Sequence, residues 1–430
     1  MTGAVAGIVS GMVSGAVTGA LTEVGAGGAA VGSLPQATSN TAISSVGVPR
    51  LAMARAPYCP PYDARVSGPD AHRRAVHSAW EEYGDPRRIT SLDEVSANVS
   101  TNRVYRVHLD DRSTFVCKVS SYGSYFLFVE DHDRLFRCAR LLDSTRFAGM
   151  LADVWTIRDG GTDSSGEAPA GRIFTWYDRK MWAVFYDDVP RGESLPRVLS
   201  QEMIENLGRE MAEFHLACAD LTPRIPAGSK TIKSDAIHLL DLLESPFAPR
   251  NFDLPPEAIG VLWNHTHDFL ERLVELGYDD IARIPVLIDW NLGNFSVTRA
   301  THSGQGDGFR LFSRWDYDWF RIEPRLLDFY FLSRVSSSTG DRTRFTYGAH
   351  TLVEPGFLAL IRAYRDVDPL TAEELAFLPE VYRFFILNYV VREGARFFRD
   401  DLCRQFREDA VRTYLPMFDG FDFSPLLALA

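Results

Sequence analysis

The sequence predicts an α+β fold, with a small antiparallel sheet in its first half and mostly helices in its second. Residues 89–121 alternate apolar and polar side chains around short turns, which is typical of antiparallel strands. From residue 200 onward, apolar residues recur at helical spacing instead. A connector rich in acidic residues, proline and glycine, residues 187–195, separates the two patterns and is suited to joining two lobes.

The composition fits a large, folded and acidic protein. Of the 430 residues, 46% are hydrophobic and 12% are aromatic, which is enough for a sizeable core. The formal net charge of −12 argues against a general binder of nucleic acids or anionic membranes. The five cysteines have no metal-ligand or redox spacing, so a reducing cytoplasm is the simplest location. The sequence does not predict an oligomeric state.

Residues 1–57 differ from the rest of the chain in composition. Glycine recurs at every fourth position from Gly3 to Gly19, mostly between Ala, Val, Ile, Ser and Thr. Such a repeat is compatible with a glycine-zipper membrane helix, but no basic flank and no Leu-rich or Phe-rich centre supports one. The alternatives are a disordered tail and an extension upstream of a start near Met53. We expect this low-complexity tail to carry no chemistry.

The first lobe, residues 58–188, is expected to hold two helices and five strands. In chain order we expect a helix over 75–83, three strands within 89–121, a helix over 126–142, and strands over 172–177 and 181–186. Lys118 lies within an apolar strand, where a lysine must reach water, pair with an acid or serve a ligand. An exposed edge-strand lysine is the alternative. Glu130, Asp131 and Asp133, near the start of the second helix, are candidate partners.

The second lobe, residues 189–430, is expected to be mainly helical. Helices are predicted over 205–218, 235–243, 256–276, 324–334, 355–364 and 373–398. His215 lies on the first of these helices, and we interpret it as a packed or hydrogen-bonded side chain rather than a ligand.

The centre of the chain carries three acids and an amide in a distinctive order. Asp289 precedes Asn294 by five residues within an apolar stretch, and Asp316 and Asp318 follow a second apolar run. The Gly-rich residues 301–308 between them are typical of a hairpin turn. Carboxylate and amide oxygens suit magnesium on nucleotide phosphates, and a further Asp suits activation of an attacking hydroxyl.

This order of features resembles the aminoglycoside phosphotransferase and choline kinase-like family of the protein-kinase-like fold. The resemblance covers about residues 90–335. Its best match is Asp-Trp-Asn-Leu-Gly-Asn at 289–294, which is similar to the catalytic loop His-Gly-Asp-x-His-x-x-Asn. Ala-Glu-Phe-His at 212–215 and the connector at 185–195, which looks like the lobe hinge, support the match.

The resemblance implies a two-lobed enzyme with a small antiparallel-sheet lobe that binds nucleotide and a larger helical lobe that binds the acceptor. It implies an ATP-dependent phosphotransferase that moves the γ-phosphate to a hydroxyl of a small molecule such as an amino-alcohol, a sugar or an aminoglycoside-like compound. ATP and Mg²⁺ are the implied cofactors, and the partner is the small-molecule acceptor, with no nucleic acid or membrane.

The resemblance also implies a role for individual residues. Asp289 would be the catalytic base, and Asn294 and Asp316 would bind magnesium. Asp318 has no assured counterpart in the family, and we treat it as a candidate second metal ligand. The nucleotide would meet the segment 96–102, the strand lysine and the hinge, with these residues in contact: Ser100, Asn102, Lys118, Glu130, Tyr186 and Asp188. Glu130 stands for the helix acid that pairs with the lysine, and the hinge backbone would meet adenine. Asp328 would brace the catalytic loop.

Several departures from the family pattern support a different class of function. Leu287 and Ile288 replace the usual His and Gly, Asn291 replaces a second His, and the nucleotide loop lacks glycine. The alternative is therefore a catalytically degenerate pseudokinase that acts as a nucleotide-binding or protein-interaction module.

The acceptor side is less defined. Acids of the helical lobe suit an amine acceptor or form a solvated face, namely Asp235, Asp241, Glu244, Asp279 and Asp280. Trp290 and Trp315 flank the centre, either as structural residues or as walls of an acceptor pocket.

Overall fold

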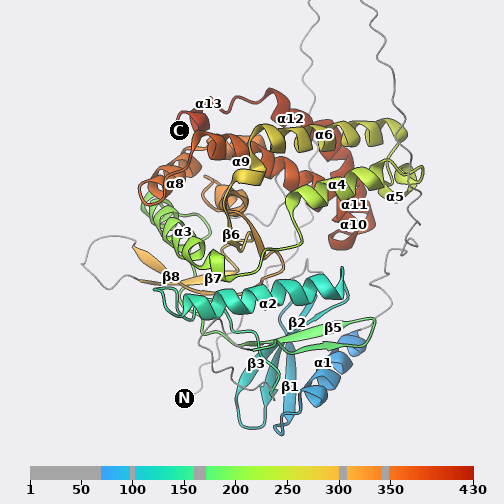
Figure 1. Cartoon of the computed structure of the whole chain (residues 1–430), viewed down its shortest axis with the longest axis vertical. Helices are drawn as coiled ribbons and strands as arrows, with labels where there is room; N and C mark the ends of the chain where they lie inside the picture. Colours follow the sequence, from blue (N-terminus) through green and yellow to red (C-terminus); the bar gives the residue numbers. More distant parts are fainter. Residues whose placement is uncertain (1–68, 97–101, 159–170, 300–307, 341–347) are drawn as a thin grey trace, which may run out of the picture. The chain divides into compact units, whose positions relative to one another are not determined.

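A computed structural model of the chain describes residues 69–96, 102–158, 171–299, 308–340 and 348–430. These residues belong to one compact unit that spans Asp63–Ala430. A five-stranded antiparallel sheet is followed by a mainly helical part, which confirms the α+β, two-lobed prediction (Figure 1). Ser100, the tail 1–57 and most of the turn 301–308 lie outside the described residues. Among the residues described, no helix is both long and apolar enough to cross a membrane.

The sheet of the first lobe has the strand order β1-β2-β3-β5-β4. The elements of this lobe are α1 (Pro69–Tyr83), β1 (Ile89–Glu94), β2 (Asn102–Leu109), β3 (Thr114–Ser120), α2 (Tyr125–Leu142), β4 (Thr175–Tyr177) and β5 (Trp182–Asp187). Every strand and helix predicted for this lobe is present. The predicted lobe border at 188/189 falls directly after β5.

The two faces of this sheet bury different partners. On β5, Ala183 and Phe185 pack with α1, whereas Val184 and Tyr186 face α2 and the helical lobe. Successive side chains of a strand point to opposite faces, so this alternation follows from strand geometry. Lys118 of β3 pairs in register with Val184. Figure 1 shows α2 between the sheet and the helical lobe, so Lys118 lies on the face that meets this lobe.

The helical lobe is built around α3 and α8, which pack closely against each other. Its helices are α3 (Gln201–Leu221), α4 (Ile232–Leu243), α5 (Ala248–Phe252), α6 (Pro256–Glu275), α7 (Phe329–Val335), α8 (Pro355–Arg365), α9 (Ala372–Phe385), α10 (Gly394–Phe397), α11 (Asp400–Asp409), α12 (Leu415–Gly420) and α13 (Ser424–Leu427). Among the described residues of this lobe, the 3₁₀ turns are η1 (Thr222–Arg224), η2 (Tyr278–Asp280), η3 (Arg325–Asp328) and η4 (Ala349–Val353), and the π-helical segments are η5 (Ile386–Arg392) and η6 (Ala410–Tyr414).

The prediction of one long helix over residues 373–398 is wrong. The α-helical hydrogen bonding of α9 ends at Phe385 and passes into the π-helical segment η5. The chain then forms the short helix α10 and becomes extended at Phe398. A π-helical segment widens the turn and redirects the chain, and apolar periodicity alone does not reveal it.

Two short pairs of strands flank the loops that contain the central acids. β6 (Arg283–Val286) pairs with β9 (Arg321–Pro324), and β7 (Phe295–Arg299) pairs with β8 (Phe309–Arg314). The predicted hairpin is therefore confirmed. A loop over 287–294 links β6 to β7, and a second loop over 315–320 links β8 to β9. Because both pairs of strands are joined, the two loops lie next to each other.

Gly208 allows the close approach of α3 and α8, and its substitution tests that packing. A Cβ at Gly208 would lie 2.5 Å from the carbonyl oxygen of Leu360, so we expect Gly208→Ala to lower the free energy of unfolding by about 1–3 kcal/mol. The matched control is Gly260→Ala on α6, where a Cβ meets nothing within 4 Å and alanine should add roughly 0.5–1 kcal/mol. Urea denaturation measures both. Equal effects of the two substitutions would contradict the close approach.

Candidate active site

A buried acid braces the loop 287–294. Asp328, at the end of η3, accepts a hydrogen bond of 2.6 Å from the backbone N–H of Ile288, and its other oxygen lies 2.9 Å from Nε2 of His215. Nδ1 of His215 lies 2.8 Å from the hydroxyl of Tyr364. Ile288 has a φ of 62°, which is unfavourable for a β-branched residue. Such a conformation persists where surrounding bonds enforce it, and the Asp328 bond does so here.

Arg314 fixes the same loop through hydrogen bonds to its backbone. The sequence did not predict this role of Arg314. Its fully buried guanidinium donates a hydrogen bond of 2.8 Å to the backbone oxygen of Asp289 and one of 3.1 Å to the backbone oxygen of Asn294. It also donates to the backbone oxygen of Trp315 in the second loop. Strand alternation places Ser313 inward and Arg314 on the outer face, so the sequence carries no signal that Arg314 is buried.

Asp289 and Asn294 lie on one loop, as the resemblance to a catalytic loop implied. Oδ1 of Asp289 accepts 2.6 Å from the side-chain amide of Asn291, the residue that stands where the family usually has His. Nδ2 of Asn294 donates 3.2 Å to the backbone oxygen of Asp289. Since the amide nitrogen is used in this bond, Oδ1 of Asn294 is the side-chain atom suited to a metal ion.

The second loop contributes Asp316 and Asp318. Asp316 has a φ of 67°. Burial, together with the negative charges of Asp318 and Asp289, raises the pKa of Asp316 to about 7. Lys118 forms an ion pair with Oδ1 of Asp318, and Asn102 donates 2.7 Å to Oδ2 of the same carboxylate. Strands of the first lobe and both loops of the second are therefore brought to one centre.

A cavity of about 310 Å³ adjoins this centre. Six of the predicted site residues line it, namely Lys118, Tyr186, Asp188, Asn294, Asp316 and Asp318. Val104 and Val116 of the sheet supply apolar walls, and Trp315 lies on the side of the loops. Asp289 is not among the lining residues, but the side chain of Asn294, which lines the cavity, donates a hydrogen bond to its backbone oxygen. The cavity thus has an apolar part and a strongly charged part.

The hinge strand β5 holds the cavity on the side opposite the loops. The hydroxyl of Tyr186 donates 2.5 Å to Nε2 of His132 on α2, and burial raises the pKa of this phenol well above its usual value. The carboxylate of Asp188 accepts from Arg106 at 2.7 and 3.1 Å and from Thr114 at 2.9 Å. The carboxylate of Asp188 is therefore occupied by hydrogen bonds to side chains of the sheet.

Glu130 does not pair with Lys118, contrary to the prediction. Its carboxylate accepts 2.7 Å from the backbone N–H of Ser229 and 2.8 Å from the Ser229 hydroxyl. Asp133, another predicted partner, pairs with Arg137 one turn along α2. Glu130 and Asp133 therefore have partners other than Lys118, and the carboxylate near Lys118 is that of Asp318.

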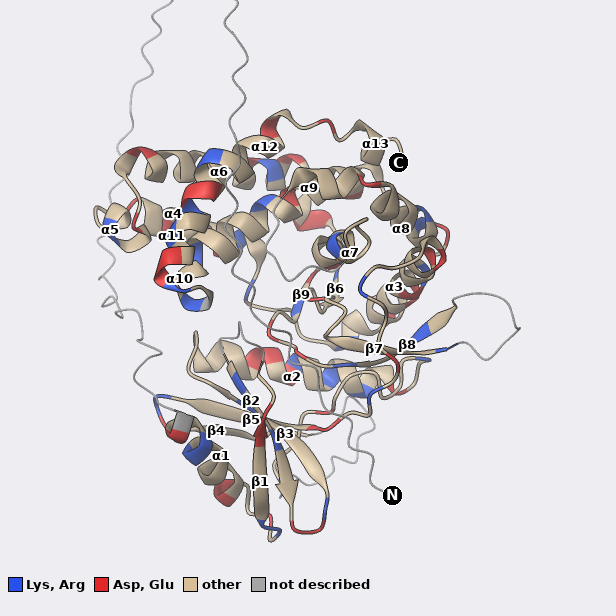
Figure 2. Cartoon of the chain, turned by 180° about the vertical axis from the view of Figure 1, so that it is seen from behind, with Lys and Arg blue, Asp and Glu red and all other residues tan. Residues whose placement is uncertain are grey.

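The acids proposed for an amine acceptor have other partners or face solvent. Asp235 is buried between Arg321 at 2.7 Å and Arg392 at 2.9 Å. Burial alone would raise the pKa of Asp235, but these two guanidinium groups lower it to about 2. Asp279 pairs with Lys233 at 2.6 Å. Figure 2 shows acidic and basic residues interspersed around α4, α10 and α11.

The two tryptophans that flank the centre differ in role. Trp290 is fully buried and packs edge-on against Phe214 and Phe295, so it is structural. Trp315 is partly exposed, lines the cavity and donates 2.9 Å to the backbone oxygen of Gly293.

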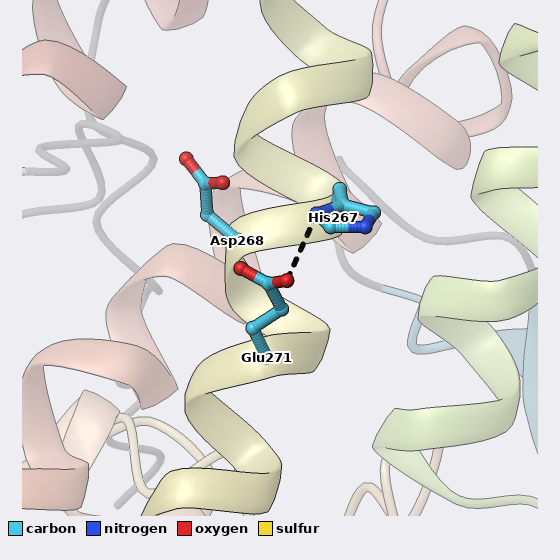
Figure 3. Close-up of side chains that lie close together, drawn as sticks. All are labelled: His267, Asp268 and Glu271. Atoms are coloured by element: carbon cyan, nitrogen blue, oxygen red, sulfur yellow. Dashed lines mark ion pairs between the residues drawn. The ribbon is translucent and has the colours of Figure 1, made fainter. Parts of the chain in front are cut away.

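One other group of side chains could hold a metal among the residues described, and it lies on the surface of α6 (Figure 3). It consists of His267, Asp268 and Glu271, with 3.8 Å between Nδ1 of His267 and Oε1 of Glu271. None of the three lines the cavity. Clusters of this kind are common on exposed helices, so we assign it no role.

The raised pKa of Asp316 predicts how stability depends on pH. The folded state keeps a proton that the unfolded state loses between about pH 4 and 7, so stability falls as pH rises through that window. Asp316→Asn removes this loss, and we expect it to gain about 1–3 kcal/mol relative to the original chain between pH 4 and pH 8. Thermal melts across this range without metal measure it. Asp241→Asn, at an exposed position of α4, is the control. Parallel stability profiles for all three proteins would contradict the raised pKa of Asp316.

Comparison with known proteins agrees with this architecture. No family model matches the chain, and no curated protein matches it either. Among solved structures, it is similar to an amicoumacin kinase in complex with AMP-PNP, Ca²⁺ and Ami, with 14% identity, a TM-score of 0.52, and coverage of 81% of this chain and 99% of that one. It is also similar to a microcompartment-associated aminopropanol kinase, with 18% identity, a TM-score of 0.52, and coverage of 83% and 100%. The chain therefore has the two-lobed fold of these small-molecule kinases, as its sequence resemblance predicted.

Proposed function

We propose that the chain is an ATP-dependent phosphotransferase that moves the γ-phosphate to a hydroxyl of a small molecule. The observation that carries this proposal is the meeting of Lys118, Asn294 and Asp316 at one cavity, with Asp289 beside it. The amicoumacin kinase of similar fold binds AMP-PNP and Ca²⁺, which supports a nucleotide and a divalent cation here. The acceptor class follows the resemblance: an amino-alcohol, a sugar or an aminoglycoside-like compound.

The residues present fit a magnesium ion. The carboxylate of Asp316 and Oδ1 of Asn294 are hard oxygen donors, the kind that Mg²⁺ prefers. The pKa of Asp316 is raised by burial and by two neighbouring carboxylates, so this position gains most from a nearby cation. When bound, the ion would neutralise charge on the phosphates during transfer.

The chain's own groups divide the remaining work. Lys118 would hold the α- and β-phosphates, and the apolar walls Val104 and Val116 would enclose the base against the hinge backbone at 186–188. Asn291 holds Oδ1 of Asp289, which orients the carboxylate to accept the proton of the acceptor hydroxyl. As the oxygen of the acceptor hydroxyl bonds to the γ-phosphorus, the bond from the γ-phosphorus to the β,γ-bridging oxygen breaks and ADP leaves.

The substitution of Leu287 for the usual His does not by itself favour the pseudokinase alternative. Leu287 is fully buried in the core, and the adjacent backbone is held by Asp328, which His215 contacts in turn. The loop thus retains a brace without a histidine of its own. Turnover separates the two functions, because a nucleotide-binding pseudokinase and a kinase both bind ATP but only the kinase transfers phosphate.

The decisive experiment is a screen of hydroxyl-bearing metabolites for ATP consumption. We expect at least one acceptor to be phosphorylated, and Asp289→Asn to lower the rate about 10²–10⁴-fold because the base is lost. Thermal shift with Mg-ATP should show that this variant still binds nucleotide. Asp268→Asn on the surface of α6 is a matched control and should leave the rate unchanged. Binding of Mg-ATP with no turnover across the panel would favour the pseudokinase, and full activity of Asp289→Asn would exclude the assigned base.

A further inference from the structure

We propose that Asp318 is the positioning residue of Lys118, in place of an acid on α2, and that it is not a ligand of the metal ion. This inference rests on the proposed function and concerns how the same site holds the nucleotide phosphates.

A buried lysine needs a counter-charge to stay ionised and aimed. Only 5% of Lys118 is exposed, and in the part of the chain that the structure describes its ion pair is with Asp318. The acids at the start of α2 do not supply the charge, because Glu130 binds Ser229, Asp133 binds Arg137, and the cations that act on Asp131 are Lys230, Arg321 and Arg134. The counter-charge therefore comes from the loop 315–320.

On α2, His132 lies within range of the charge of Lys118, and it is neutral. Its Nδ1 lies 2.6 Å from the backbone oxygen of Phe128, which can only accept, so Nδ1 carries the proton. Nε2 then accepts from the hydroxyl of Tyr186. Burial and the charge of Lys118 lower the pKa of His132 to about 3. Both ring nitrogens are thus engaged, and α2 presents an uncharged side chain to the ammonium group.

The two acids of the loop have opposite surroundings. Both oxygens of Asp318 are occupied by protein donors, Oδ1 by Lys118 and Oδ2 by Asn102. Asp316 accepts one long hydrogen bond of 3.4 Å, from the backbone N–H of Asp318, within the described residues. A carboxylate with both oxygens committed to cationic and amide donors suits an anchor, whereas the less committed one suits a metal ligand.

The segment between these acids is fixed by Tyr317. Its hydroxyl accepts 2.8 Å from the backbone N–H of Ala152 and donates to the backbone oxygen of Arg314. The lysine anchor and the metal acid are two residues apart on this held segment. One short piece of backbone would consequently determine the distance between Lys118 and the cation.

The test is the affinity for AMP-PNP, measured by calorimetry in Mg²⁺ and again in EDTA. Loss of a charged anchor should weaken binding with or without metal, so we expect Asp318→Asn to weaken it roughly 10- to 100-fold in both conditions. Asp316→Asn should weaken binding in Mg²⁺ and leave it nearly unchanged in EDTA. If Asp318→Asn instead behaves like Asp316→Asn, then Asp318 is a metal ligand and the inference is wrong.

A second pair of variants separates positioning from folding. Adding His132→Glu to Asp318→Asn returns a carboxylate to Lys118 from α2, and we expect part of the lost affinity in EDTA to return. Adding His132→Gln, which is similar in size but uncharged, should restore none. Equal affinities of the two double variants would overturn the inference. The original chain failing to bind AMP-PNP at all would instead overturn the proposed function.

Discussion

The arrangement of the site depends on the burial of one guanidinium group, that of Arg314. Removing such a charge from water costs several kcal/mol unless its donors are satisfied. Here Nη1 and Nη2 donate to backbone oxygens of Asp289, Asn294 and Trp315, and each bond to a charged group contributes about 1.5–3 kcal/mol, while Nε has no hydrogen-bond partner among the described residues. The ring of Trp290, 5.5 Å from the guanidinium carbon, supplies a further favourable contact. Since the three oxygens belong to two loops, the same group that must be satisfied also sets the distance between them.

This constraint explains why unfavourable features cluster nearby. Ile288 and Asp316 have positive φ angles, and three carboxylates share one region. Each would cost stability alone, and neighbouring carboxylates destabilise each other further. They persist because Asp328, Arg314 and Lys118 hold the backbone and compensate part of the charge. The concentration of strain and like charge at a cavity is itself typical of a functional site.

The sequence predicted the site where local patterns carry the information. The resemblance to a catalytic loop placed Asp289 and Asn294 on one loop, and strand alternation placed Lys118 in the sheet. Partners distant in the chain were not predictable, because ion pairing depends on the packing of lobes. Lys118 and Asp318 are two hundred residues apart, and Glu130 was the nearer candidate. The buried ion pairs of Asp235 with Arg321 and Arg392 were not predictable for the same reason, because they too depend on tertiary packing.

Glu130 matters for a different property than the one first expected of it. Its bonds to Ser229 tie α2 to the helical lobe, while His132, two residues on, ties α2 to the sheet through Tyr186. A helix anchored on both sides cannot swing independently of either lobe. Moving the sheet away from the helical lobe on this side would therefore break at least one of these attachments. In the proposed enzyme, a serine, a glutamate and a neutral histidine would then resist the separation of the lobes.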